Sequence, residues 1–160
     1  MSRSTAQHTV SYPGVVYPKD AEHVTIYYEP GEFAAWPFNH GFWAFSDDEL
    51  LISFSRGPCS YELKYDMRHN VVDALGGEYV VLRSTDGGRT WPREGLQSLG
   101  SRFKLERQLL TGLAPNAPTE PVDWSSPDFC LSAGFGIPPQ KSREVGYIQF
   151  SRDRGYTWEG

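Results

Sequence analysis

The sequence predicts an all-β fold built from short strands and many turns. The chain has 160 residues, of which 39% are hydrophobic and 14% aromatic, enough for a sizeable core. Its sixteen glycines and twelve prolines indicate frequent turns. Segments rich in β-branched and aromatic residues recur between these turns, whereas no segment shows a strong helical period. These observations favour a sandwich, a barrel or a propeller.

Six segments have the composition and length of strands, bounded by Gly, Pro, Asp or Ser. In chain order they are 23–29, 41–45, 50–55, 78–84, 129–135 and 145–151. Residues 100–110 suit either one or two helical turns or an extended edge strand. Residues 111–127 contain four prolines and are predicted to be mostly loop. The connection 57–77 is long and polar, and long connections in compact domains are often functional.

One eight-residue motif occurs twice, each time directly after a predicted strand. Residues 84–91 and 151–158 both read S-x-D-x-G-x-T-W. In such a turn the Asp side chain can accept hydrogen bonds from turn amides, and the Gly can take a positive φ. The Trp can fold back over the hairpin as an apolar plug. The residues expected to build the two turns are Ser84, Asp86, Gly88, Trp91, Ser151, Asp153, Gly155 and Trp158.

The repeated motif resembles the Asp-box, or bacterial neuraminidase repeat, of the sialidase superfamily. Members of that family are six-bladed β-propellers in which the box joins the third and fourth strands of a blade. The resemblance implies an all-β, sialidase-type propeller fold, with about two blades in this chain. It also implies a structural role for Asp86 and Asp153, because the family's boxes lie away from the catalytic face.

The resemblance divides the chain into an N-terminal extension, residues 1–22, and a partial propeller, residues 23–160. The first blade would cover about 23–110, and a second, incomplete blade about 125–160. A complete six-bladed propeller needs roughly 300 residues or more at four strands per blade. We therefore expect the remaining chain of a longer protein to close the propeller, with self-association of copies as the alternative.

The resemblance extends to the start of the first blade, where sialidases carry an F-R-I-P-like segment. Residues 33–37 read FAAWP here, and Pro37 falls on the family's proline. Ala35 falls where the family has the first of three arginines that bind the sialic acid carboxylate. Arg56 matches the second arginine. The resemblance thus implies a carbohydrate substrate, and the missing arginine favours a neutral or differently charged sugar over sialic acid.

Two stretches hold the remaining candidate site residues. Residues 35–43 bring Trp36, Asn39 and His40 together, and aromatic rings beside amide and imidazole groups suit sugar binding. The connection 57–77 contains Asp66 and Asp73, and the resemblance implies an acid/base Asp in this connection. Asp66 is the candidate for that catalytic role.

Each of these assignments has a plainer structural alternative. The aromatic residues of 35–43 could belong to the core of the first blade, with Asn39 and His40 in a turn. Asp66 could lie in a solvated charged loop, and Arg56 could form an ion pair at the end of a strand. Asp128, just before the predicted strand 129–135, is a further candidate to line the central face.

The leading functional hypothesis is a glycan-active hydrolase that cleaves a terminal glycosidic bond by acid/base chemistry, without metal or cofactor. The alternatives are a non-catalytic carbohydrate-binding or scaffold propeller, and a polysaccharide lyase on the same fold that uses a pair such as Tyr65 and His69. A metal site formed by His40, His69 and Asp66 would have no spacing signature. The net charge of −5, with scattered basic residues, gives no reason to expect nucleic acid.

The compartment is left open by the sequence, with the cytoplasm slightly favoured. Residues 1–8 lack the features of a secretory signal, and no apolar run approaches the roughly 20 residues of a membrane helix. Cys59 and Cys130 lack any metal-binding spacing and are predicted to be reduced, small apolar residues. A disulfide between them would need an oxidising compartment.

Overall fold

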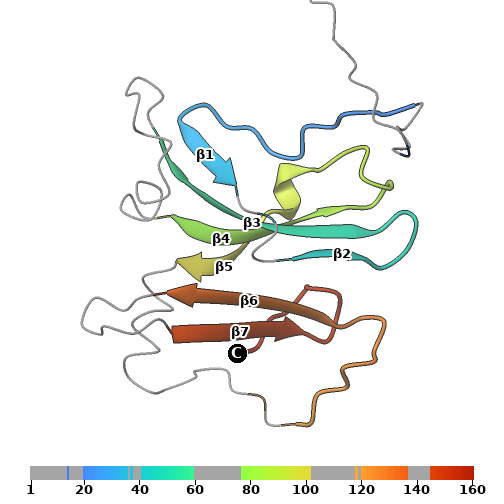
Figure 1. The fold of residues 1–160 in the computed structure, drawn as a ribbon, viewed down its shortest axis with the longest axis vertical. Coiled ribbons are helices and arrows are strands. Elements are labelled where there is room, and N and C mark those ends of the chain that lie inside the picture. The colour runs from blue at the N-terminus through green and yellow to red at the C-terminus, as the bar shows by residue number, and fades with distance from the viewer. Residues whose placement is uncertain are drawn as a thin grey trace, which may run out of the picture.

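The structure, a computed structural model, describes residues 14, 20–35, 37, 41–59, 77–101, 118, 120–136 and 145–160. Its described elements are strands and one short 3-10 helix, which confirms the all-β prediction. The strands form two antiparallel sheets that pack against each other (Figure 1). The elements are β1 (Glu32–Ala35), β2 (Phe42–Ala44), β3 (Leu50–Pro58), β4 (Glu78–Ser84), η1 (Arg93–Gly95), β5 (Gln97–Ser101), β6 (Cys130–Gly136) and β7 (Val145–Ser151).

The larger sheet is a meander in the order β1-β3-β4-β5, and β2 also pairs with β3. In the central pair, Leu50 lies opposite Ser84 and Arg56 lies opposite Glu78. The smaller sheet contains β6 and β7, with Cys130 opposite Ser151. Each strand that enters a box turn, β4 or β7, therefore pairs with the strand before it along the chain.

The two central strands of the larger sheet are buried on both faces. Because side chains alternate along a strand, neighbouring residues of β3 face opposite sides. One face carries a buried cluster, with side chains from 26–27 and from the box region packed against it; the cluster is Ile52, Phe54, Val80 and Leu82. The other face packs against the smaller sheet, through Leu51, Val81 and Cys130, with Trp43, Phe45, Leu99 and Trp158 around them.

Five of the six predicted strands are close to the observed ones, and two of these five, β4 and β7, have the predicted bounds. The predicted strand at 23–29 was wrong, because the structure assigns no strand there. Gly31, with a φ of 80°, lies in a turn, and residues 32–35 pair with β3 in place of 23–29. Ile26 and Tyr27 are partly buried against the core without strand pairing, so burial alone accounts for their apolar composition.

Residues 97–101 form β5, and of the segment 100–110, for which the sequence allowed either helical turns or an edge strand, only 100 and 101 are described, both in this strand. In the smaller sheet, an isolated bridge pairs Phe150 with Glu159 beyond the second box turn. Neither Cys59 nor Cys130 forms a disulfide, and both are buried, as predicted. The division into blades at 23–110 and 125–160 stays a prediction.

The strand ends form two opposite borders of the sheets, and these borders carry different residues. Both box turns follow the strand ends at Ser84 and Ser151, and the turn between β2 and β3 lies at the same border. We call this border, formed by strand ends and not by an outermost strand, the box edge. The opposite edge carries Arg56 and Glu78, together with the strand ends that flank residues 60–76 and 137–144.

Candidate functional site

The first box turn is closed by the side chain of Asp86. Thr90 donates to this carboxylate twice, from its amide to Oδ1 (2.9 Å) and from its hydroxyl to Oδ2 (2.6 Å). The Ser84 hydroxyl donates to Oδ1 (2.7 Å) and accepts a bond from the Gly88 amide (2.9 Å). Gly88 has a φ of 84°, and its carbonyl accepts a bond from the Trp91 indole (2.9 Å).

The second box turn repeats these bonds one for one. Thr157 donates to Asp153 from its amide (2.8 Å) and its hydroxyl (2.7 Å). The Ser151 hydroxyl donates to Asp153 (2.7 Å) and accepts from the Gly155 amide (2.7 Å). The Trp158 indole donates to the Gly155 carbonyl (3.1 Å), and Gly155 has a φ of 82°. The bonds that the sequence predicts for the Asp, and the positive φ of the Gly, are thus present twice.

The hydrogen bonds of the turns keep both aspartates ionised. Donation from the Thr90 hydroxyl and amide, and then from Ser84, lowers the pKa of Asp86 to about 2. Burial raises the pKa of Asp153, but bonds from Thr157 and Ser151 outweigh burial and leave that pKa lowered. A carboxylate with a low pKa and with its oxygens occupied is poorly suited to donate a proton to a substrate.

A second repeated motif lies before the hairpins that carry the boxes, and the sequence alone did not predict it. Residues 46–48 before β3 read SDD, and residues 126–128 before β6 read SPD. In both, the Ser hydroxyl accepts a bond from the amide of the Asp, at 3.3 Å. The Asp carbonyl then accepts an amide of the box turn, with Asp48 bound to Gly87 (2.9 Å) and Asp128 to Arg154 (2.8 Å). The pattern that could have predicted this repeat is S-x-D placed just before the first strand of each hairpin, β3 or β6.

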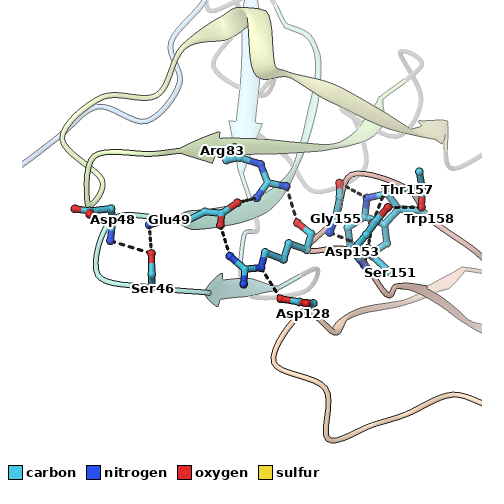
Figure 2. A network of polar contacts seen from close by, with 11 residues as sticks. Ser46, Asp48, Glu49, Arg83, Asp128, Ser151, Asp153, Gly155, Thr157 and Trp158 are labelled. Atoms are coloured by element: carbon cyan, nitrogen blue, oxygen red, sulfur yellow. Dashed lines mark hydrogen bonds and ion pairs between the residues drawn. The ribbon is translucent and has the colours of Figure 1, made fainter.

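Glu49 joins the two sheets at the box edge. Its Oε1 accepts a bond from Arg83 Nη1 (2.5 Å), and its Oε2 from Arg154 Nη1 (2.8 Å). Arg154 Nε also donates to the Asp128 carboxylate (2.5 Å), and Arg83 Nη2 donates to the Arg154 carbonyl (2.5 Å) (Figure 2). Asp128, a candidate for the central face, therefore lies instead at the box edge in an ion pair.

Arg56 lies at the opposite edge of the larger sheet, in a cluster with four other polar side chains. Its Nε and Nη2 approach Glu78 Oε1 at 2.8 Å and 2.6 Å. Its Nη1 donates to the Tyr27 hydroxyl (2.8 Å) and lies 3.5 Å from Glu32 Oε2. The Tyr27 hydroxyl donates to Glu32 Oε2 (2.5 Å), and Ser98 donates to Glu78 Oε2 (2.6 Å). Arg56 is thus paired within the chain, as the strand-end alternative expects.

Partial burial and pairing set the protonation of this cluster. Burial, followed by the bond to Glu32, raises the pKa of Tyr27, so the phenol stays protonated at neutral pH. Burial lowers the pKa of Arg56 and raises that of Glu78, but hydrogen bonds outweigh burial in both groups. The pKa of Arg56 is therefore raised and that of Glu78 lowered, and the two form a charged pair.

An apolar groove of about 340 Å³ lies beside this cluster. Its lining comes from residues 24–27, from β1 and β3, and from Pro37. Tyr27 belongs both to the groove, as one of its lining residues, and to the polar cluster, because its hydroxyl contacts Arg56. Ala35 and Pro37, from the FAAWP segment, line the groove too. An apolar groove with a few polar groups at one end is the usual form of a small-ligand site.

Several predicted site residues lie outside the described residues. They are Trp36, Asn39, His40, Tyr65, Asp66, His69 and Asp73. Residues 60–76 lie in the chain between Pro58, the last residue of β3, and Glu78, the first residue of β4. Both of these residues are at the same edge as Arg56. The structure thus describes one predicted substrate-binding residue, Arg56, and adds Tyr27, Glu32 and Glu78. Glu32 and Glu78 reach Arg56 through pairing between β1, β3 and β4, and Tyr27 reaches it from the unpaired segment before β1.

Comparison with models of known protein families, with curated proteins and with solved structures gave no match. Among the described residues, no group of three or more His, Cys, Asp or Glu side chains is placed to hold a metal ion. Within the same part of the chain, no helix has the length and apolar character needed to cross a membrane.

Proposed function

We propose that the protein is a glycan-active hydrolase built as a sialidase-like propeller, with its sugar site at the edge opposite the box turns. The observation that carries the proposal is the equivalence of the two box turns. Each follows the second strand of an antiparallel pair and is closed by the same five kinds of hydrogen bond, and the sheets that bear them pack face to face. A repeated unit that stacks sheets in this way is typical of a propeller.

The groove and the Arg56 cluster supply features that a sugar site needs. The groove offers an apolar surface for a pyranose face, and the hydroxyl of Tyr27 and the guanidinium of Arg56 beside it can bond to sugar hydroxyls. In this proposal the acid/base group is Asp66, from the connection whose flanking strand ends lie at the same edge. The substrate would be held by Arg56, Trp36, Asn39 and His40.

The local charge supports a neutral sugar over an acidic one. Two guanidiniums, those of Arg56 and Arg93, lie near the Tyr27 ring. They pair with three carboxylates, those of Glu29, Glu32 and Glu78. A sugar carboxylate would compete with these acids for the arginines and would be repelled by them. Ala35, in the place of an arginine in the family, fits the same preference.

A panel of aryl glycosides and free glycans tests the proposal with the full chain. We expect hydrolysis of a neutral glycoside, with activity lost in Asp66→Asn and reduced in Tyr27→Phe, which removes only the hydroxyl. Tyr156→Phe, at an exposed ring of the box edge, is the matched control and should keep full activity. Neither binding nor hydrolysis of any sugar in the panel would refute the proposal.

A second candidate is a non-catalytic carbohydrate-binding propeller, and one observation favours it. Glu32 and Glu78, the carboxylates described in the cluster, are both held by donors of the chain. The raised pKa of Tyr27 also makes this phenol a poor nucleophile. Binding of a glycan without turnover, unchanged by Asp66→Asn, would select this function. A lyase would require Tyr65 and His69, which lie outside the described residues.

A further inference from the structure

The apolar groove follows one face of β3 and extends away from the polar cluster. Side chains two residues apart on a strand share a face, so Ile52, Phe54 and Arg56 lie in one row along β3. Ile52 and Phe54 line the groove, and the Tyr27 ring lies 5.3 Å from the Phe54 ring between centroids. Because a strand rises by about 3.3 Å per residue, Ile52 lies roughly 13 Å along β3 from Arg56. The groove therefore reaches beyond the groups that can bond to a sugar.

The lining of this extension suits an apolar group better than a sugar ring. Among the described lining residues, Thr25 and Tyr27 are those with polar side-chain atoms, and the Tyr27 hydroxyl is engaged by Glu32 and Arg56. The other lining side chains are aliphatic or aromatic. A sugar ring carries hydroxyls around its edge, and hydroxyls taken from water into such surroundings without partners cost free energy. An apolar group has no such cost and gains from burial.

The size and the charges of the groove narrow the choice further. Its volume of about 340 Å³ is near the lower end of the range of about 300–1,000 Å³ for small-ligand pockets, so it holds one compact group. At its end, the Arg56 guanidinium lies 3.5 Å from the Glu32 carboxylate. A charged occupant would compete for one member of this pair, whereas an uncharged one leaves the pair intact.

We propose that the groove is an aglycone site, which binds an uncharged aryl or branched alkyl group linked to the anomeric oxygen of the sugar. The sugar itself lies at the end that carries Tyr27 and Arg56, and the aglycone extends along β3 toward Ile52. Val24 and Ala34, which line the groove and are exposed, border the space that the aglycone fills. The inference rests on the proposed glycan activity and names its substrate class, neutral glycosides with an apolar aglycone.

Isothermal titration calorimetry of the full chain tests the proposal. The probes are 2-naphthol, and the 2-naphthyl and methyl thioglycosides of each neutral sugar in the panel, whose sulfur linkage resists hydrolysis. We expect 2-naphthol to bind alone. For any sugar that binds, the naphthyl compound should bind at least about tenfold more tightly than the methyl compound, because its rings bury apolar surface.

A substitution that fills the groove should remove this advantage. Ala34→Phe adds a ring from an exposed position of β1, so the ratio of the naphthyl to the methyl affinity should fall about tenfold, toward one, with the methyl affinity unchanged. Ala44→Phe is the matched control, because it makes the same change at an exposed position of β2 outside the groove lining, and it should keep the wild-type ratio. Circular dichroism should show wild-type spectra for both variants.

Val24→Asp provides a second variant if Ala34→Phe unfolds or also weakens the methyl compound. Val24 is 39% exposed in a segment without strand pairing, and a carboxylate there should weaken 2-naphthol binding about tenfold. Wild-type affinity for 2-naphthol in this variant, an unchanged ratio in Ala34→Phe, or an equal fall in Ala44→Phe would overturn the proposal.

The failure of the aglycone site can be told apart from the failure of the glycan activity. Absence of 2-naphthol binding to the wild type, or equal affinities for the two thioglycosides of a sugar that binds, would overturn the aglycone site and leave the glycan activity standing. Binding of 2-naphthol without binding or hydrolysis of any glycoside would refute the glycan activity and, with it, the aglycone role of the groove.

Discussion

Gly155, in the turn of the smaller sheet, lies directly against Leu51 of the larger sheet. A methyl group at Gly155 would overlap Leu51 Cδ2 and approach Trp158 at 3.3 Å. Gly88 occupies the same place in the first turn, but a methyl group there would meet Leu50 Cδ1 at 3.1 Å within its own sheet. The two glycines share a backbone conformation and differ in the packing around them.

Gly155→Ala should therefore destabilise the protein more than Gly88→Ala. Both alanines pay for a positive φ, about 1–2 kcal/mol, and only Gly155→Ala adds an overlap at the interface of the sheets. We expect the free energy of unfolding to fall by about 2–4 kcal/mol in Gly155→Ala and by about 1–2 kcal/mol in Gly88→Ala. Urea denaturation of the two variants measures both, and equal losses would show that the sheets do not pack at this point.

Stability should fall in acid partly because of the box aspartates. The pKa of Asp86 is about 2 in the folded chain, against about 3.9 in an unfolded one. Since the folded pKa is depressed, its contribution is complete above about pH 4 and is lost as the pH falls toward 2. Asp153, whose pKa is also lowered, should act in the same direction.

Melting temperatures recorded from about pH 5 down to about pH 2 test this dependence. Asp86→Asn should melt below the wild type at the upper end and approach it at the lower end, because the variant has no charge to lose. Asp20→Asn is the control, since Asp20 is exposed and lies outside the box turns. A constant gap between the Asp86 variant and the wild type over this range would contradict the assignment.

Arg154 combines a strained backbone with useful ion pairs, and two substitutions separate these effects. It is a non-glycine residue with a φ of 59°, at the position that Gly87 fills in the first turn. Both Arg154→Ala and Arg154→Gly lose the bonds to Glu49 and Asp128, but only the glycine relieves the left-handed backbone. We expect Arg154→Gly to melt above Arg154→Ala in a thermal denaturation; the reverse order would indicate that this backbone is not strained.

Much of the fold could be predicted from the sequence, because its turns carry local signals. The Asp, Gly and Trp of each box act over a few residues, so S-x-D-x-G-x-T-W alone predicts both turns and the strands before them. Residues 23–29 have strand composition but gain their stability by packing Ile26 and Tyr27 on the core. Composition cannot tell a paired strand from an unpaired segment that buries the same side chains.

The polar cluster could not be predicted to the same extent, because it is assembled by register. Glu32 and Glu78 meet Arg56 through the pairing of β1 and β4 with β3, and Tyr27 meets it because the unpaired segment before β1 packs on the core. No local pattern in the sequence relates these residues. The bridge of Glu49 to Arg154 likewise depends on how the two sheets pack, and a single sequence does not contain that information in a readable form.

Loss of Arg56 should change the titration of Glu78 and weaken the fold. In Arg56→Met the burial of Glu78 remains while its cation is removed, so the pKa of Glu78 should rise. The free energy of unfolding should fall by about 1–3 kcal/mol at neutral pH, because a partly buried carboxylate loses its partner. Carboxyl carbon shifts in an NMR titration and urea denaturation measure the two effects.

Arg89→Met provides the comparison for this prediction. Arg89 is exposed and donates a hydrogen bond to the Asp86 carbonyl at the surface, so its loss should cost less than about 1 kcal/mol. An unchanged pKa of Glu78 in Arg56→Met would mean that the arginine does not hold this carboxylate, and the cluster would lose its place in the candidate site.

Cys130 should be unreactive in the folded protein. It is 1% exposed between the sheets, and burial raises the pKa of its thiol to about 11. At about pH 8 almost no thiolate forms, and the thiolate is the species that attacks alkylating reagents. Iodoacetamide followed by peptide mass spectrometry should leave Cys130 unmodified until denaturant is added. Because Cys130 packs with Leu51 and Val81, its labelling under native conditions would mean that the two sheets separate in solution.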